Sequence, residues 1–124
     1  MSKFVIRETA TGIKFDLVAG NGEPIGTSQV YASKATCKAG IESVKRVAPV
    51  AKMEDQTVEN WEKVTNPKFE IYIDAAGEPR FRLRAANGQE ILASQAYSSK
   101  EACEKGIASV VKNAPEAEVT EKEK

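Results

Sequence analysis

The chain has 124 residues, of which 41% are hydrophobic and 29% are charged. Eighteen basic residues balance eighteen acidic ones, so the chain lacks the net positive charge that attracts nucleic acids regardless of their sequence. It contains no histidine, which removes the commonest general base near neutral pH and the commonest metal ligand. This length suits one domain, or two small halves that share a core.

No membrane segment or signal peptide is predicted. No apolar run approaches the roughly 20 residues that a membrane-spanning helix needs. Near the N-terminus, Arg7 and Glu8 interrupt the short apolar stretch, so no signal-peptide core is present. We therefore expect a cytoplasmic protein without a membrane partner.

The first part of the chain predicts three strands and a helix. Apolar and polar residues alternate over 4–7 and 13–17, the pattern of strands with one buried face. Asn21-Gly22 then predicts a hairpin turn, because both residues tolerate positive φ, and a third strand is expected over 25–31. Ser33 is a suitable N-cap for a helix that ends near residue 47, before Pro49.

One face of this helix is predicted to pack against the sheet. Cys37, Gly40, Ile41, Val44 and Ala48 recur at helical spacing. Glycine in a helix interior costs about 1 kcal/mol relative to alanine, so Gly40 predicts a close approach of the helix to the sheet. A short strand is predicted over 50–54, and Trp61, in the connector that follows, is expected to anchor that connector by packing.

The same plan then occurs a second time. The pattern S-Q-x-Y-x-S-K-x-x-C-x-x-G-I-x-S-V-x-x-x-A-P spans residues 28–49 and again 94–115. Strands are predicted over 69–73, 81–85 and 91–97, and a helix is expected after Ser99. A short strand is expected near 116–120, and residues 121–124 are expected to fray. We therefore predict an α+β protein with a first repeat at 1–56, a connector at 57–67 and a second repeat at 68–124. Units near 60 residues are marginal alone, so the two repeats should form one cooperative unit with pseudo-two-fold symmetry.

Two cysteines, Cys37 and Cys103, occupy matching positions of the repeat. Two thiols without histidine do not make a four-ligand zinc site, and neither lies in a C-x-x-C motif. We interpret both as small buried residues with free thiols, and we predict no metal site and no cofactor.

The repeated motif resembles the YegP-like family of small bacterial proteins of unknown function. The residues that carry the resemblance are Asn21-Gly22, Tyr31, Lys34, Gly40 to Val44 and Ala48, with Asn87-Gly88, Tyr97, Lys100, Gly106 to Val110 and Asn113-Ala114. The resemblance implies β(3)-α-β units that share one mostly antiparallel sheet, with the helices on one face. It also implies that the units exchange their C-terminal strands, and it carries no catalytic or ligand-binding residue over to this chain.

One group of side chains suggests a binding face. Arg80, Arg82 and Arg84 alternate along a predicted strand and therefore point to one face of the sheet, which is a possible site for an anion, a nucleic acid or an acidic partner. The simpler interpretation is a solvated strand face on which carboxylates such as Glu70 pair with the arginines.

The repeated tyrosines and lysines allow a second interpretation. Tyr31 with Lys34, and Tyr97 with Lys100, could suggest acid–base chemistry at a strand-to-helix junction. Without histidine or a recognisable nucleophile–base pair, a structural role is favoured, in which the lysine stem covers the tyrosine ring. We therefore predict a non-enzymatic binding or protein-interaction module. The alternative is a weak nucleic-acid or anion binder that uses the arginine face.

Overall fold

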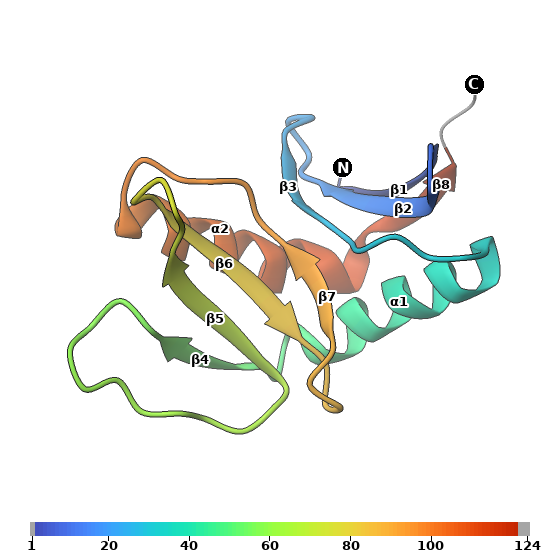
Figure 1. The fold of residues 1–124 in the computed structure, drawn as a ribbon. Coiled ribbons are helices and arrows are strands. Elements are labelled where there is room, and N and C mark those ends of the chain that lie inside the picture. Colours follow the sequence, from blue (N-terminus) through green and yellow to red (C-terminus); the bar gives the residue numbers. More distant parts are fainter. Residues whose placement is uncertain (1, 122–124) are drawn as a thin grey trace.

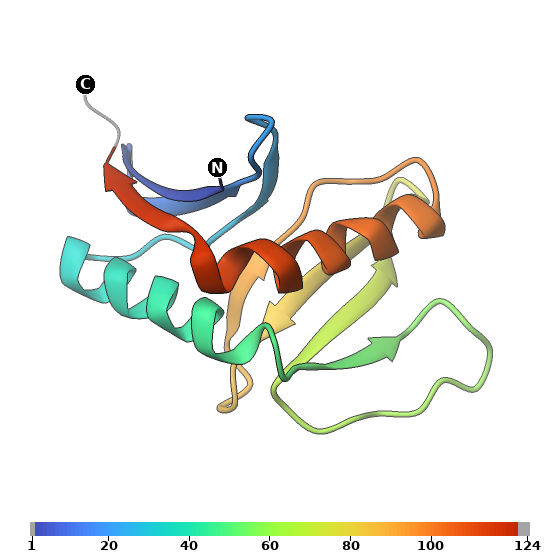
Figure 2. The ribbon, with the colours of Figure 1, turned by 180° about the vertical axis from the view of Figure 1, so that it is seen from behind.

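One sheet of eight strands carries two helices on one face, as Figures 1 and 2 show from opposite sides. The computed structural model describes residues 2–121. In chain order its elements are β1 (Lys3–Thr9), β2 (Gly12–Val18), β3 (Pro24–Thr27), α1 (Lys34–Val47), β4 (Lys52–Asp55), β5 (Lys68–Ile73), β6 (Pro79–Arg84), β7 (Glu90–Ala93), α2 (Lys100–Asn113), the short 3₁₀ helix η1 (Ala114–Glu116) and β8 (Glu118–Glu121). The predicted α+β fold with two β(3)-α-β units is confirmed.

The first three strands of the two repeats occupy opposite halves of the sheet. The strand order is β4-β5-β6-β7-β3-β2-β1-β8, so each strand of one repeat has its counterpart at the mirrored position. β3 and β7 meet in the middle through a single antiparallel residue pair, Thr27 with Ala93. The halves are therefore joined at this central seam by little backbone pairing.

The last strand of each repeat lies in the other repeat's half of the sheet. β4 runs parallel to β5, with Lys52 beside Lys68, and β8 runs parallel to β1, with Lys3 beside Glu118. The five other strand pairs are antiparallel. The expected strand exchange is confirmed. Glu121, which was predicted to fray, belongs to β8, and residues 122–124 of that prediction lie outside the described residues.

The core lies between the sheet and the helices. Phe4, Phe15, Phe69 and Phe81 are at most 1% exposed, and the Phe4 and Phe15 rings meet edge to face at 5.6 Å between centroids. The predicted face of α1 is buried here, as are Cys103, Ile107 and Val110 of α2. Both helices start at the predicted caps, with the Ser33 and Ser99 side chains accepting from the third amide of each helix. Helix spacing in the sequence therefore identified the core correctly.

The mid-helix glycines make room for tyrosine side chains. A Cβ atom at Gly40 would overlap the Tyr31 hydroxyl, and one at Gly106 would overlap the Tyr97 hydroxyl. Each tyrosine also stacks on a core phenylalanine, with centroids 6.2 Å apart for Tyr31 and Phe15. The close approach predicted from Gly40 is thus made by a side chain from the strand-to-helix connection.

The third strand of each repeat is shorter than predicted. The expected strands 25–31 and 91–97 end at Thr27 and Ala93. The cause in the first repeat is Ser28, whose buried hydroxyl accepts from the Phe15 amide at 3.0 Å and donates to the Gln29 carbonyl at 2.7 Å. The Ser28 side chain thus takes the place of a backbone acceptor in the pairing of β2 with β3. After Ser28 the chain leaves the sheet, except for an isolated bridge between Ile13 and Tyr31.

The connector between β4 and β5 is not anchored by Trp61, which is 43% exposed, so that prediction was wrong. The connector is held through the backbone of Val64 instead. Its amide donates to the Glu54 carboxylate at 2.8 Å, and its carbonyl accepts from the Lys68 ammonium at 3.2 Å. Two buried charges fix the loop, so its aromatic side chain is left at the surface.

Candidate functional site

The arginine face lies on the side of the sheet that the helices do not cover, and its charges are largely paired. Glu70 accepts from the Nε atoms of both Arg82 and Arg84 through one carboxylate oxygen. The Arg82 guanidinium also lies 4.3 Å from the centre of the Tyr72 ring, and Arg84 donates to the Gly88 carbonyl at 2.9 Å. Pairing with Glu70, which the sequence analysis gave as the simpler interpretation, is what the structure shows for these two arginines.

Buried charges extend this arrangement towards the sheet edge. The Lys68 ammonium lies 2.7 Å from Glu54 Oε2 and 3.3 Å from Glu70 Oε2, and Glu54 and Lys68 are only 2% and 4% exposed. Burial alone would raise the pKa of Glu54, but hydrogen bonds from Lys68, Gln56 and the Val64 amide outweigh it and lower that pKa to about 2. Sequence reasoning missed this cluster, because only the folded connector shows that these charges are covered.

Arg80 differs from the other two arginines. Its Nε donates to Asp74 Oδ2 at 2.7 Å, while Asp74 Oδ1 accepts from the amides of Ala76 and Glu78, both at 2.9 Å. The structure therefore does not join the three predicted arginines into one site. Arg82 and Arg84 share Glu70, whereas Arg80 is held by a turn and faces the central seam.

The repeated lysines have partners that sequence reasoning did not identify. Lys34, at the start of α1, lies 2.7 Å from Glu121 in β8, and Lys100, at the start of α2, pairs with Asp55 in β4. In both cases the lysine of one repeat contacts the exchanged strand of the other. These lysines therefore hold strands in place, whereas the predicted role was to cover a tyrosine ring.

The repeated tyrosines line two equivalent grooves, which we call the paired grooves. The first, of about 390 Å³, contains Gln29, Tyr31, Thr36, Ala39, Gly40, Ser43, Ala85, Asn87, Gln89 and Ile91. The second, of about 310 Å³, contains Gln95, Tyr97, Ala102, Lys105, Gly106, Ser109, Ala19, Asn21, Glu23 and Ile25, with Pro24 in addition. Each groove therefore combines the tyrosine and helix of one repeat with the Asn-Gly hairpin of the other.

The two grooves match position by position. All ten lining residues of the first have their repeat counterparts in the second, and seven of these ten pairs are identical, although the two copies differ at about half of the positions from Phe15 to Pro49. The exceptions replace Thr36, Ala39 and Gln89 of the first groove by Ala102, Lys105 and Glu23 of the second. The first groove is thus free of charged residues, and the second adds one charge of each sign.

Packing accounts for some of these identities but not for all. Ile25, Ile91 and the glycines are explained by the core and by the tyrosine rings. Gln95 is exposed, and its side chain makes no hydrogen bond within residues 2–121. Gln95 is therefore available to an external ligand, whereas its counterpart Gln29 hydrogen-bonds Tyr31.

The phenols of the paired grooves are hydrogen-bonding groups at neutral pH. Burial raises the pKa of both Tyr31 and Tyr97 above the ordinary value of 10.0, so each hydroxyl stays protonated. With the amides of Gln29 and Asn87 and the hydroxyl of Ser43, the first groove offers both donors and acceptors. Such a lining suits a ligand that is uncharged but polar.

The described residues contain no group of three metal-ligating side chains, and the helices of residues 2–121 include none that could cross a membrane.

Cys37 and Cys103 are buried free thiols, as predicted. Burial raises the pKa of the Cys37 thiol, and it raises that of Cys103 to about 11. Neither sulfur is therefore a thiolate at neutral pH.

Comparison with known proteins agrees with the predicted resemblance. The sequence model of the domain of unknown function DUF1508 matches residues 9–55 and 74–121, once in each repeat. A UPF0339 protein of Bordetella pertussis is 38% identical over 114 residues, covering 92% of this chain and 89% of that protein. A UPF0339 protein of Methanosarcina acetivorans is 60% identical over 52 residues, which make up 42% of this chain but 90% of that protein.

A solved structure extends the similarity to the whole fold. The solution structure of YegP from E. coli, described as a protein of unknown function, has a TM-score of 0.79 and 32% sequence identity. The match covers 97% of this chain and 91% of that chain. With its duplicated domain, its exchanged strands and these relatives, the chain belongs to the DUF1508 family, also called UPF0339, whose function is unknown.

Proposed function

We propose that the protein is a non-enzymatic binding module of the cytoplasm that holds an uncharged polar segment of a protein partner in each of its paired grooves. The observation that carries the proposal is the match between the grooves, where seven of ten lining pairs are identical. Peptide groups of an extended chain both donate and accept, which fits the amides and hydroxyls of Gln29, Asn87 and Ser43. The tandem repeat works as a monomer in this proposal, because its two halves already complete one sheet.

The non-enzymatic part of the proposal is supported by the chemistry of the repeated residues. The raised pKa values of Tyr31 and Tyr97 suit hydrogen bonding better than proton abstraction. The ammonium groups of Lys34 and Lys100 are directed at carboxylates of the exchanged strands. Neither pair resembles a nucleophile with its base.

Site-specific photocrosslinking in cells tests this proposal. A photoreactive residue is placed at Ala39 or at Lys105, the exposed and equivalent rim positions of the two grooves, and a control is placed at the exposed turn residue Ala75. Both rim positions are expected to capture the same protein, and combined substitution of Gln29→Ala and Gln95→Ala should reduce the yield. Capture of unrelated proteins at the two rims, or equal capture at Ala75, would contradict the proposal.

A second candidate function is weak binding of anions or nucleic acids by Arg80, Arg82 and Arg84. One observation favours it: among residues 2–121, Arg82, Arg84 and Lys68 have only the two carboxylates Glu70 and Glu54 at ion-pair distance, with Glu90 acting on Arg82 from further away. The test is binding of short oligonucleotides at low salt by the wild type and by the triple alanine variant of these arginines. Binding that falls with added salt and is lost in the variant supports this candidate, whereas no binding at low salt removes it.

A further inference from the structure

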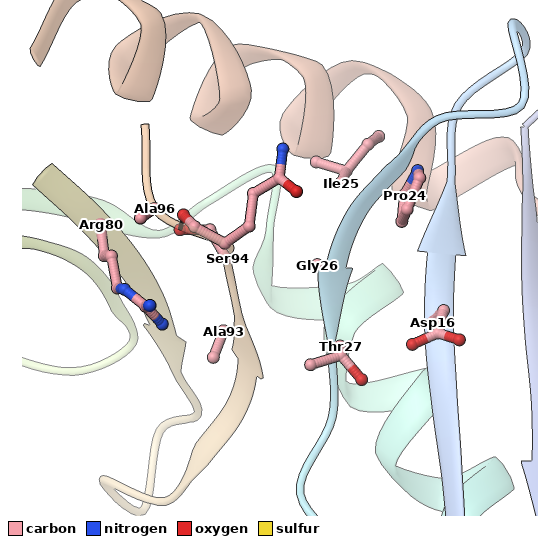
Figure 3. Close-up of a pocket in the computed structure, with 10 residues that line it drawn as sticks. Asp16, Pro24, Ile25, Gly26, Thr27, Arg80, Ala93, Ser94 and Ala96 are labelled. Atoms are coloured by element: carbon pink, nitrogen blue, oxygen red, sulfur yellow. Dashed lines mark hydrogen bonds between the residues drawn. The ribbon is translucent and has the colours of Figure 1, made fainter. Parts of the chain in front are cut away.

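A third groove lies on the open face of the sheet, beside the central seam (Figure 3). Its volume is about 360 Å³. It forms where β3 and β7 separate beyond their single residue pair, and its floor is made of small residues such as Gly26 and Ala93. We call it the seam groove.

Arg80 forms one wall of the seam groove. Its Nε is fixed by Asp74 at 2.7 Å, which orients the guanidinium plane. Within residues 2–121 the structure assigns no hydrogen bond to its two terminal nitrogens, and Figure 3 shows the guanidinium in front of β6, on the side of Ala93. Two adjacent N–H groups of a fixed guanidinium match the two oxygens of a carboxylate.

Asp16 forms the opposite wall. Its carboxylate is held by Arg7, with Nε 2.7 Å from Oδ2 and Nη2 3.3 Å from Oδ1. In Figure 3 it lies in front of β2, beyond Thr27 as seen from Arg80. Each carboxylate oxygen accepts about two hydrogen bonds, so one position on each remains for a ligand.

We propose that the seam groove binds a small zwitterion, an ω-amino acid whose carboxylate pairs with Arg80 and whose ammonium group pairs with Asp16, with several methylene groups between them because β7 and β3 separate the two walls. A lone anion would meet the carboxylate of Asp16, and a lone cation would meet the guanidinium of Arg80, so a ligand that carries both charges is favoured over either. The uncharged floor between the walls accommodates the methylene groups that separate the two charges.

The other repeat lacks this arrangement, so the chain has one such site. The repeat counterparts of Arg80 and Asp16 are Lys14 and Arg82, two cations. The counterpart of Gly26 is Leu92, whose Cγ would lie 2.9 Å from a Cβ atom at Gly26. This inference can be tested separately from the proposed function, since the paired grooves need neither Arg80 nor Asp16, although Pro24, Ile25 and Gln95 line both the seam groove and the second paired groove.

An NMR titration of the full chain with ω-amino acids tests the inference. Glycine, β-alanine, γ-aminobutyrate and 5-aminovalerate place the two charges at increasing separations, and acetate and methylamine carry one charge each. One amino acid of the series is expected to saturate below about 10 mM and to shift the amides of residues 26–27 and 93–96. The Arg80 Nε–H resonance should shift with them.

Variants separate the two walls of the site. Arg80→Gln and Asp16→Asn should each weaken binding about tenfold or more, while Arg84→Gln, which alters the Glu70 pairs outside the groove, should leave it unchanged. Retention of the wild-type spectrum away from the groove confirms that each variant is folded, and Arg80→Lys serves as a second variant that keeps the charge. Saturation by acetate as strong as by any amino acid, or no saturable shift with the whole series, overturns the inference.

Discussion

The Lys34 ammonium lies 2.7 Å from Glu121 Oε1, although 86 positions separate the two residues in the chain. Lys34 begins the helix of the first repeat, and Glu121 ends the last strand of the second. The equivalent contact joins Lys100 to Asp55. Each helix is therefore bound to a strand that the other repeat supplies, which makes the two repeats depend on each other.

A chain cut in the connector should not fold. A fragment of residues 1–60 lacks β8 beside β1 and leaves β4 without β5. We expect poor dispersion in its NMR spectrum at concentrations where the fragment is monomeric. A well-dispersed spectrum from the monomeric fragment would show that strand exchange is not required for folding.

Gly106→Ala should destabilise the protein, against the usual trend. In a helix interior this change normally stabilises by about 1 kcal/mol, but here the new Cβ would overlap the Tyr97 hydroxyl, and such overpacking costs about 1–3 kcal/mol. Chemical denaturation measures the difference. The double variant with Tyr97→Phe should recover part of the loss, since it removes the hydroxyl but leaves the ring carbon at 2.8 Å and Phe81 Cε2 at 3.0 Å, and a stabilised single variant would disprove the steric explanation.

The Glu54–Lys68 pair should make stability depend on pH in acid. The pKa of Glu54 is about 2 in the folded protein and 4.5 ordinarily, so its contribution is complete above pH 4.5 and is lost as the pH falls towards 2. The free energy of unfolding, measured between these pH values, should fall less steeply in Glu54→Gln. Other carboxylates with lowered pKa values, such as Glu70 and Asp55, account for the slope that remains.

Removal of one partner of the same pair should lower the free energy of unfolding far more than removal of both. Lys68→Met leaves the buried Glu54 charge without its ammonium partner and should cost about 3–5 kcal/mol at neutral pH. The double variant Glu54→Leu and Lys68→Met should be more stable than the single one. Equal stability of the single and double variants would mean that the pair is not energetically coupled.

The two thiols should resist modification in the folded protein. With its pKa raised to about 11, Cys103 is ionised in only about one molecule in a thousand at pH 8, and both sulfurs are buried. We expect a disulfide reagent to react slowly with the native protein and rapidly with both thiols in guanidinium. Rapid reaction of one native thiol would show that its site opens locally.

Most of the fold could be predicted from the repeat pattern, because helix spacing, N-caps and Asn-Gly turns depend on residues that are close together in the sequence. The positions of α1 and of the caps Ser33 and Ser99 follow from a few neighbouring residues. The early end of β3 was not predictable in this way. It depends on the hydroxyl of Ser28 reaching the Phe15 amide, thirteen residues away.

The binding surfaces were harder to predict, because they need the relative placement of the two repeats. The paired grooves place Tyr31 opposite Asn87, and the seam groove places Arg80 opposite Asp16. Nothing in either repeat alone indicates these neighbours. Alternation along β6 did predict a common face for Arg80, Arg82 and Arg84, but it could not show that Glu70 joins two of them and not the third.

The parallel pairing of β1 with β8 has a consequence for synthesis on the ribosome. β1 emerges well before the strand that lies beside it, because Lys3 pairs with Glu118, 115 positions later in the chain. Contacts of such large sequence separation form slowly, and an edge that is unpaired during translation is open to association with other chains. The N-terminal half of the sheet is therefore completed only after β8 has been made.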